Sequence, residues 1–102
     1  MKVQLLTFPD CPHAAGAREV LTSALVSSGV AAHIEELDTT APDTSEALRE
    51  WGSPTILIDG RDIAEGSPGG ASCRLYRNAS GRTVGAPPAA LVRDAIARAL
   101  RQ

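Results

Sequence analysis

Residues 3–14 read VQLLTFPDCPHA, and this stretch decides the fold of the chain. Its first half, residues 3–8, is almost continuously apolar over the length of a strand. That pattern is typical of a strand buried on both faces of a sheet. Pro9 and Asp10 end the strand. The stretch therefore predicts a central strand that stops just before Cys11.

A helix is predicted to follow over residues 12–28. Pro12 suits its first position, because the missing N–H of proline costs nothing there, and Gly29 suits the left-handed residue that ends it. Cys11 is then the N-cap, where unpaired backbone N–H groups and the helix dipole favour an anion. Because the thiolate is the nucleophilic form of cysteine, we expect Cys11 to be reactive, with His13 adding to the effect when charged. The plainer interpretation is that Cys11 only caps the helix.

Strands and helices alternate along the rest of the sequence. The expected elements are a strand over 32–38, a short helix from the Asp43–Glu46 capping box to Trp51, a strand over 53–58, an Asp59-Gly60 hairpin turn with a return strand over 61–63, and a last helix after Pro87-Pro88. Residues 64–88 form an irregular insertion, in which residues 73–77 fit a short strand.

The order of these elements predicts one α/β domain over residues 1–102. Alternation implies parallel pairing through right-handed crossovers, and the hairpin adds an antiparallel edge. We therefore expect a three-layer α/β/α arrangement around a mixed four-stranded sheet, in the order strand, helix, strand, helix, strand, strand, helix.

Composition and charge limit the partners and the location that we expect for the protein. The chain has 102 residues, 43% of them hydrophobic, with a formal net charge of −2 and a pI of about 5.6. No basic stripe suggests nucleic acid as a partner. The N-terminus is too short for a secretion signal, and no apolar run reaches the ~18 residues of a membrane span. We expect a cytoplasmic protein, in which cysteines are reduced and serve as reactive or metal-binding groups.

Two segments of the chain together resemble the thioredoxin superfamily. They are FPDCPHA at residues 8–14 and GSPT at residues 52–55. In this resemblance Cys11 matches the nucleophilic cysteine and Pro54 matches the cis-proline that faces it. The resemblance spans most of the chain, and the insertion at 64–88 departs from it. It implies a thioredoxin-like fold and thiol chemistry.

The resemblance also implies a substrate site. Pro12, His13, Ser53 and Pro54 are expected to contact the substrate, whose extended chain pairs with backbone groups beside the proline. The family's second, resolving cysteine is missing, because Ala14 stands in its place. A dithiol enzyme needs that thiol to release its mixed disulfide. The protein therefore resembles the monothiol members.

Cys73 is the second cysteine of the chain, and three interpretations of it stay open. It is an inert buried residue, a distant thiol that resolves the Cys11 adduct, or the second ligand of a soft metal ion, since thiolates select soft metals. The sequence does not show whether the two sulfurs meet.

The leading functional prediction is a thiol-dependent redox protein, a candidate thiol–disulfide oxidoreductase without a resident cofactor or metal. Its partner is expected to be a protein disulfide, a small thiol or another electrophile. One alternative follows from a resemblance to small actinobacterial thioredoxin-like proteins labelled alkylmercury lyase. It is soft-metal or organomercurial handling by Cys11 and Cys73, with Asp10 as a source of protons. The other alternative is a binding module of the same fold without catalysis. The oligomeric state is left open.

Overall fold

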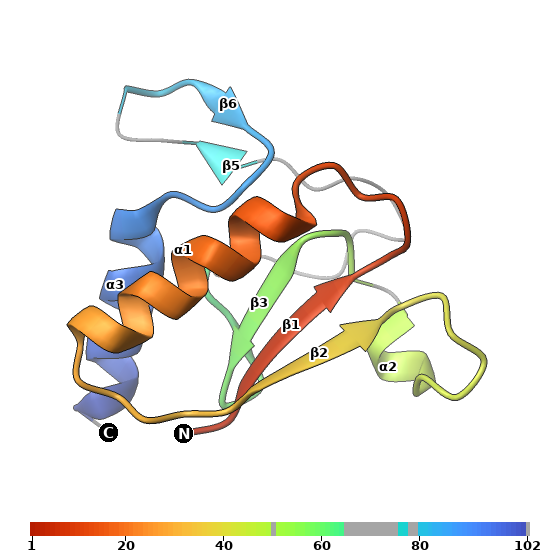
Figure 1. Cartoon of the computed structure of the whole chain (residues 1–102), viewed down its shortest axis with the longest axis horizontal. Helices are drawn as coiled ribbons and strands as arrows, with labels where there is room; N and C mark the ends of the chain where they lie inside the picture. Colours follow the sequence, from red (N-terminus) through yellow and green to blue (C-terminus); the bar gives the residue numbers. More distant parts are fainter. Residues whose placement is uncertain (50, 65–75, 78–79, 102) are drawn as a thin grey trace.

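Four strands pair into one mixed sheet in the order β2-β1-β3-β4 (Figure 1). The structure, a computed structural model, describes residues 1–49, 51–64, 76–77 and 80–101. The four strands are β1 (Val3–Thr7), β2 (Ile34–Asp38), β3 (Thr55–Ile58) and β4 (Arg61–Asp62). Residues 3–6 of β1 are all buried, as their apolar run predicts. The α/β class and the mixed four-stranded sheet are therefore confirmed.

The pairing of β3 differs from the prediction. β1 and β2 run parallel, whereas β3 runs antiparallel to β1, with Leu6 opposite Thr55. A parallel crossover needs a helix long enough to carry the chain back along the sheet. The helix between β2 and β3 has four residues, or about 6 Å of length, against about 17 Å for a five-residue strand. β3 therefore starts at the end of the sheet where β2 finishes.

That helix, α2 (Glu46–Arg49), is shorter than the sequence predicts. The expected capping box is wrong, because Asp43 lies inside a turn rather than at the start of the helix. The Thr44 N–H donates to the Ala41 carbonyl at 3.1 Å. The Arg49 guanidinium donates to the carbonyls of Ala41, Pro42 and Thr44 at 2.8–3.0 Å. These bonds fold residues 41–44 before the helix begins.

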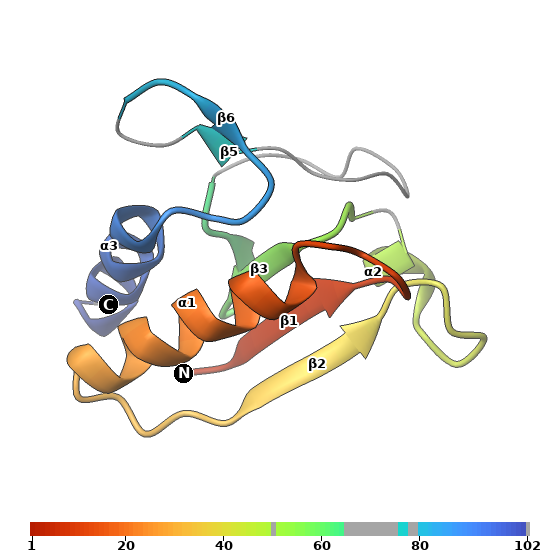
Figure 2. The same ribbon diagram turned by 45° about the horizontal axis from the view of Figure 1, so that its top comes forward.

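Two longer helices, α1 (Ala14–Ser27) and α3 (Ala89–Leu100), cover one face of the sheet (Figures 1 and 2). Both contribute to the hydrophobic core, and α3 follows Pro87-Pro88 with its apolar stripe inward, as predicted. The core joins residues of both helices and of the facing side of the sheet: Val3, Leu5, Ala17, Leu21, Ala24, Leu25, Ile56, Ile58, Ile63, Val92, Ala95 and Ile96. α2 is a single turn of four residues, so among the described residues the predicted three-layer arrangement is not established.

The predicted hairpin turn is present. Asp59 and Gly60 have φ of 52° and 82°, the double left-handed conformation of a two-residue hairpin loop, which glycine adopts without strain. The predicted irregular insertion contains a second pair of strands, β5 (Tyr76–Arg77) and β6 (Thr83–Val84). β6 falls where a loop is predicted. Residues 73–75 of the expected strand lie outside the described residues.

No helix in the described part of the chain has the length and apolarity needed to cross a membrane.

Candidate functional site

Two consecutive turns hold Cys11 between β1 and α1. The Cys11 N–H donates to the Phe8 carbonyl, and the Cys11 carbonyl accepts from the Ala14 N–H, each at 3.3 Å. Both turns have proline at their second position, where its fixed φ is favoured. Asp10 follows the first proline with φ of 65°, as a type II turn requires at its third position. The sequence PDCPH thus builds a rigid loop with its cysteine at the junction of two turns.

The helix begins later than predicted. α1 starts at Ala14, so its N-cap is His13 and not Cys11, and the His13 side chain makes no capping hydrogen bond. The reason is the second turn, which keeps residues 11–13 out of the helix. The influence of the helix dipole falls off within the first turn. Cys11 therefore lies farther from the positive end of the helix than its predicted position as N-cap.

Cys11 carries a free thiol and is partly buried, whereas Pro12 and His13 are exposed. The loop that holds it lies against the start of β3. Continuing the antiparallel register beyond Leu6 and Thr55 brings Phe8 opposite Ser53, and the Phe8 N–H donates to the Ser53 Oγ at 3.3 Å. A turn keeps its first and last Cα atoms within about 7 Å. The two segments that resemble the thioredoxin superfamily are therefore neighbours in space.

Ser53 and Pro54 are fully buried, unlike Pro12 and His13. The peptide bond between them is cis, the isomer that the resemblance predicts. Ser53 accepts from Phe8 through its hydroxyl, and the Pro54 carbonyl accepts a hydrogen bond from the Tyr76 hydroxyl at 2.6 Å. The Thr55 hydroxyl closes the neighbouring turn by donating to the Gly52 carbonyl at 2.6 Å.

Two residues of this site were missed from sequence. Tyr76 is 4% exposed and reaches Pro54 from β5. Gly85 follows β6 and lies so close to His13 that a Cβ added there would come within 2.2 Å of the imidazole ring. A buried tyrosine usually has a hydrogen-bond partner for its hydroxyl. The sequence does not identify that partner for Tyr76. No local pattern marks Gly85.

Cys73 lies outside the described residues, so all three interpretations of it stay predictions. Within the described part of the chain, no group of three or more Cys, His, Asp or Glu side chains is placed to hold a metal ion. The expected metal pair of Cys11 and Cys73 needs a residue that the structure does not describe. Asp10, the expected proton source, is exposed.

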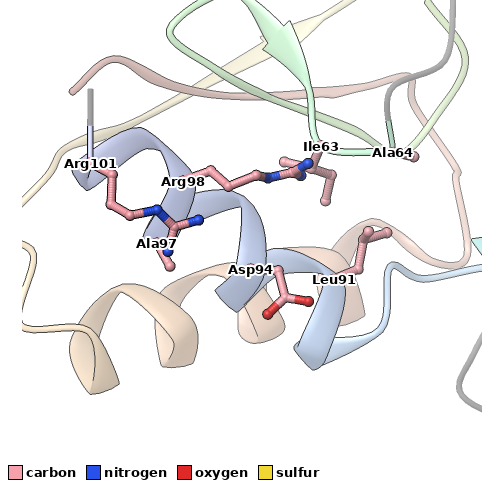
Figure 3. A pocket seen from close by; sticks show the side chains of 7 residues that line it. All are labelled: Ile63, Ala64, Leu91, Asp94, Ala97, Arg98 and Arg101. Atoms are coloured by element: carbon pink, nitrogen blue, oxygen red, sulfur yellow. The ribbon is translucent and has the colours of Figure 1, made fainter.

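The described structure also contains a groove of about 410 Å³ away from the cysteine loop. Figure 3 shows the Arg98 side chain extending from α3 toward Ile63, while the Arg101 guanidinium lies near Ala97. The lining residues are Ile63, Ala64, Leu91, Asp94, Ala97, Arg98 and Arg101. Because none of them belongs to residues 8–13 or 52–54, this groove is separate from the candidate thiol site.

The shifted pKa values lie on and beside β2. The Thr40 hydroxyl, which donates to the Asp38 carboxylate at 2.6 Å, is the main cause that lowers the pKa of Asp38; the Thr40 backbone N–H at 2.8 Å adds to it. The hydrogen bond to Glu36 raises the pKa of Arg18 above its ordinary value. The Arg18–Glu36 pair joins α1 to β2 at the surface.

Comparison of the chain with protein-family models, with curated proteins and with solved structures gave no match.

Proposed function

We propose that this chain is a thiol-dependent redox protein with a thioredoxin-like, three-layer fold, in which Cys11 exchanges with disulfides. The Cys11 thiolate attacks one sulfur of a disulfide R–S–S–R′, so that a Cys11–S–S–R bond forms and the R–S–S–R′ bond breaks. The released R′ thiolate takes up the proton that Cys11 has lost. A second thiol, small or from the chain itself, then attacks the adduct and restores Cys11, so that atoms and electrons balance over the cycle.

The placement of Cys11 is the observation that carries this proposal. A thiol that only filled space would be expected inside the core, since free cysteine behaves as a small hydrophobic residue. Cys11 instead lies partly exposed between two proline turns. Its loop is bonded to the segment that contains Pro54. A fixed backbone around a partly exposed cysteine favours reaction at that residue over a structural role.

His13 supports the same chemistry from two residues away. Its ring lies against Gly85, so the segment after β6 restrains this member of the cysteine loop. When protonated, an imidazole stabilises a neighbouring thiolate, and when neutral it accepts a proton. We assign it the role of a positioning residue for the charge at Cys11. A reducing, cytoplasmic setting fits a thiol that has to stay free.

The test is the formation of a mixed disulfide. Incubation with oxidised glutathione should add one glutathionyl group to the wild-type chain at Cys11, as located by peptide mass spectrometry. The Cys73→Ser variant should be modified at the same residue, and Cys11→Ser should lose that adduct. Modification confined to Cys73, with Cys11 unreacted in the folded protein, would contradict the proposal.

The same experiment distinguishes the interpretations of Cys73. If Cys73 resolves the adduct, the wild-type chain loses glutathione again and ends two hydrogens lighter, whereas Cys73→Ser retains the adduct. If Cys73 is inert, both chains retain it. A resolving role closes a loop of 62 residues, counted from position 11 to position 73.

A further inference from the structure

The backbone beside Pro54 is closed to an extended partner. Ser53 is 0% exposed and Pro54 is less than 2% exposed. Proline has no N–H to donate, and the Pro54 carbonyl already accepts from the Tyr76 hydroxyl. Before the proline, the Gly52 carbonyl accepts from the Thr55 hydroxyl, and the Ser53 side-chain hydroxyl accepts from the Phe8 N–H. Addition of a strand needs free backbone donors and acceptors at a reachable edge. Here these groups are used or buried.

Tyr76 belongs to the β5–β6 hairpin, which touches both loops of the candidate site. At the first strand of the hairpin, the Tyr76 hydroxyl bonds to the loop that contains Pro54. After the second strand, Gly85 packs against His13 in the cysteine loop. Figure 2 shows the chain that links β6 to α3 passing beside the first turn of α1. The hairpin is therefore tied to the proline side and to the cysteine side.

The two sides of the site differ in access. Cys11 is partly exposed and its neighbours Pro12 and His13 are exposed, so the cysteine side of the site is open to solvent. An extended polypeptide also has to lie along residues 52–54, which it reaches only after the Tyr76–Pro54 bond has opened. Breaking this hydrogen bond therefore adds to the activation free energy of extended substrates only.

We propose that Cys11 reacts with low-molecular-weight disulfides and that Tyr76 is the specificity-determining residue that excludes extended polypeptides. This inference rests on the proposed thiol function and names its substrate class. In the reaction, the Cys11 thiolate attacks one sulfur of the small disulfide and forms a mixed disulfide with it, the original S–S bond breaks, and the leaving thiolate takes up the proton that Cys11 has lost. A low-molecular-weight thiol returns Cys11 to its free form.

The experiment compares two substrates with the same leaving group. One is the mixed disulfide of glutathione with thionitrobenzoate, and the other is an extended peptide whose central cysteine carries the same group. All chains carry Cys73→Ser, so that Cys11 is the only thiol, and the release of coloured thionitrobenzoate is followed by absorbance. The wild-type site should react faster with the glutathione substrate than with the peptide.

Tyr76→Phe tests the role of the hydroxyl. It should raise the rate with the peptide roughly fivefold, as expected for one net hydrogen bond removed from the closed state, and leave the glutathione rate within about twofold. The matched control is Thr83→Ala, an exposed position in the other strand of the hairpin, which should change neither rate. Equal wild-type rates with the two substrates, or no gain for the peptide in Tyr76→Phe, would overturn the inference.

A second measurement needs no variant of Tyr76. The same peptide with serine in place of its cysteine should leave the glutathione rate of the wild-type site unchanged, and competition by this unreactive peptide would count against the inference. Failure of the proposed function looks different, because Cys11 would then react with neither substrate in the folded protein.

Discussion

A single glycine sets how close the loop before α3 comes to the cysteine turns. A Cβ at Gly85 would lie 2.2 Å from two atoms of the His13 ring, a distance that side chains do not tolerate. His13 is exposed and its side chain is flexible, so its ring moves before the backbone does. Gly85 thus leaves the space that the His13 ring of the cysteine loop occupies.

We expect Gly85→Ala to displace the His13 ring, while the free energy of unfolding changes by about 0.5 kcal/mol or less. The measurement is the NMR signal of the His13 ring protons, with His33 as an internal reference. The control is Gly16→Ala, whose Cβ would lie 3.6 Å from the Ala86 Cβ, an ordinary contact. It should leave the His13 signals in place and stabilise α1 by up to about 1 kcal/mol. An unmoved His13 signal in Gly85→Ala would show that the backbone yields instead.

For Thr39 as well, the sign of the change in stability on substitution is predictable. Its side chain is 2% exposed, and its hydroxyl has no hydrogen-bond partner within the described structure. Thr39→Val replaces that hydroxyl with a methyl group of similar size. We expect the free energy of unfolding to rise by about 1 kcal/mol, and Tm by roughly 4–8 °C in a domain of this size. Thermal unfolding by circular dichroism measures it. A lower Tm in Thr39→Val than in the wild-type protein would indicate a bonded hydroxyl.

Among the elements, the turn after β2 makes a contribution to the stability of the fold that depends on pH. The hydrogen bonds from Thr40 lower the pKa of Asp38 in the folded chain. A lowered pKa stabilises the fold above the unfolded value of about 3.9, and this contribution is lost as the pH falls through the folded value. Thr40→Val removes the hydroxyl donor and keeps the backbone donor.

In Thr40→Val the pKa of Asp38 should therefore rise toward its ordinary value without reaching it. The variant should be less stable than the wild type at neutral pH, and the difference should shrink as acid protonates Asp38. Carboxyl NMR titration measures the pKa, and urea unfolding at several pH values measures the stability. Thr22→Val is the control, because the Thr22 hydroxyl donates to a backbone carbonyl, that of Arg18, at 2.8 Å. A difference between Thr40→Val and the wild type that persists in acid would assign the effect to packing.

Elements with a strong local signal could be predicted from sequence. The apolar stripe of α3 after two prolines, the buried run of β1 and the Asp59-Gly60 turn each depend on neighbouring residues alone, and each is confirmed. The direction of β3 could not, because it depends on the length of α2. That length is set by bonds from Arg49 to carbonyls earlier in the chain. Hydrogen bonds of this kind leave no periodic pattern of residues in the sequence.

On the scale of the whole molecule, the candidate site joins three parts of the chain that are far apart in sequence. The sequence indicates two of them, around Cys11 and Pro54, since both contain residues with distinctive chemistry. The third, with Tyr76 and Gly85, follows a stretch without a clear pattern. The contact of Tyr76 with Pro54 spans 22 residues and depends on the path of the hairpin. The sequence indicates the residues that suggest a thiol site, whereas the burial of residues 53 and 54 follows only from the fold.

The last helix closes the core that supports this site, and its buried face allows a final prediction. Val92 and Ile96 of α3 are both 0% exposed and belong to the same cluster as α1 and the sheet. Ile96→Ala should lower the free energy of unfolding by about 2–5 kcal/mol, and Ile96→Val by about 0.5–1.5 kcal/mol. Leu100→Ala, at a position that is 56% exposed, should change it by about 0.5 kcal/mol or less.

Urea unfolding followed by circular dichroism measures these changes. Because α3 packs on α1 and on β3 in one core, each variant should unfold in a single transition with the wild-type slope against urea. A typical domain has about 5–15 kcal/mol of stability in total, so Ile96→Ala removes a large share of it. The opposite result, an early separate transition for α3 with the sheet left folded, would mean that the helix is an independent unit. The thiol site, held by its own turns and by the Phe8–Ser53 bond, would then outlast the loss of α3.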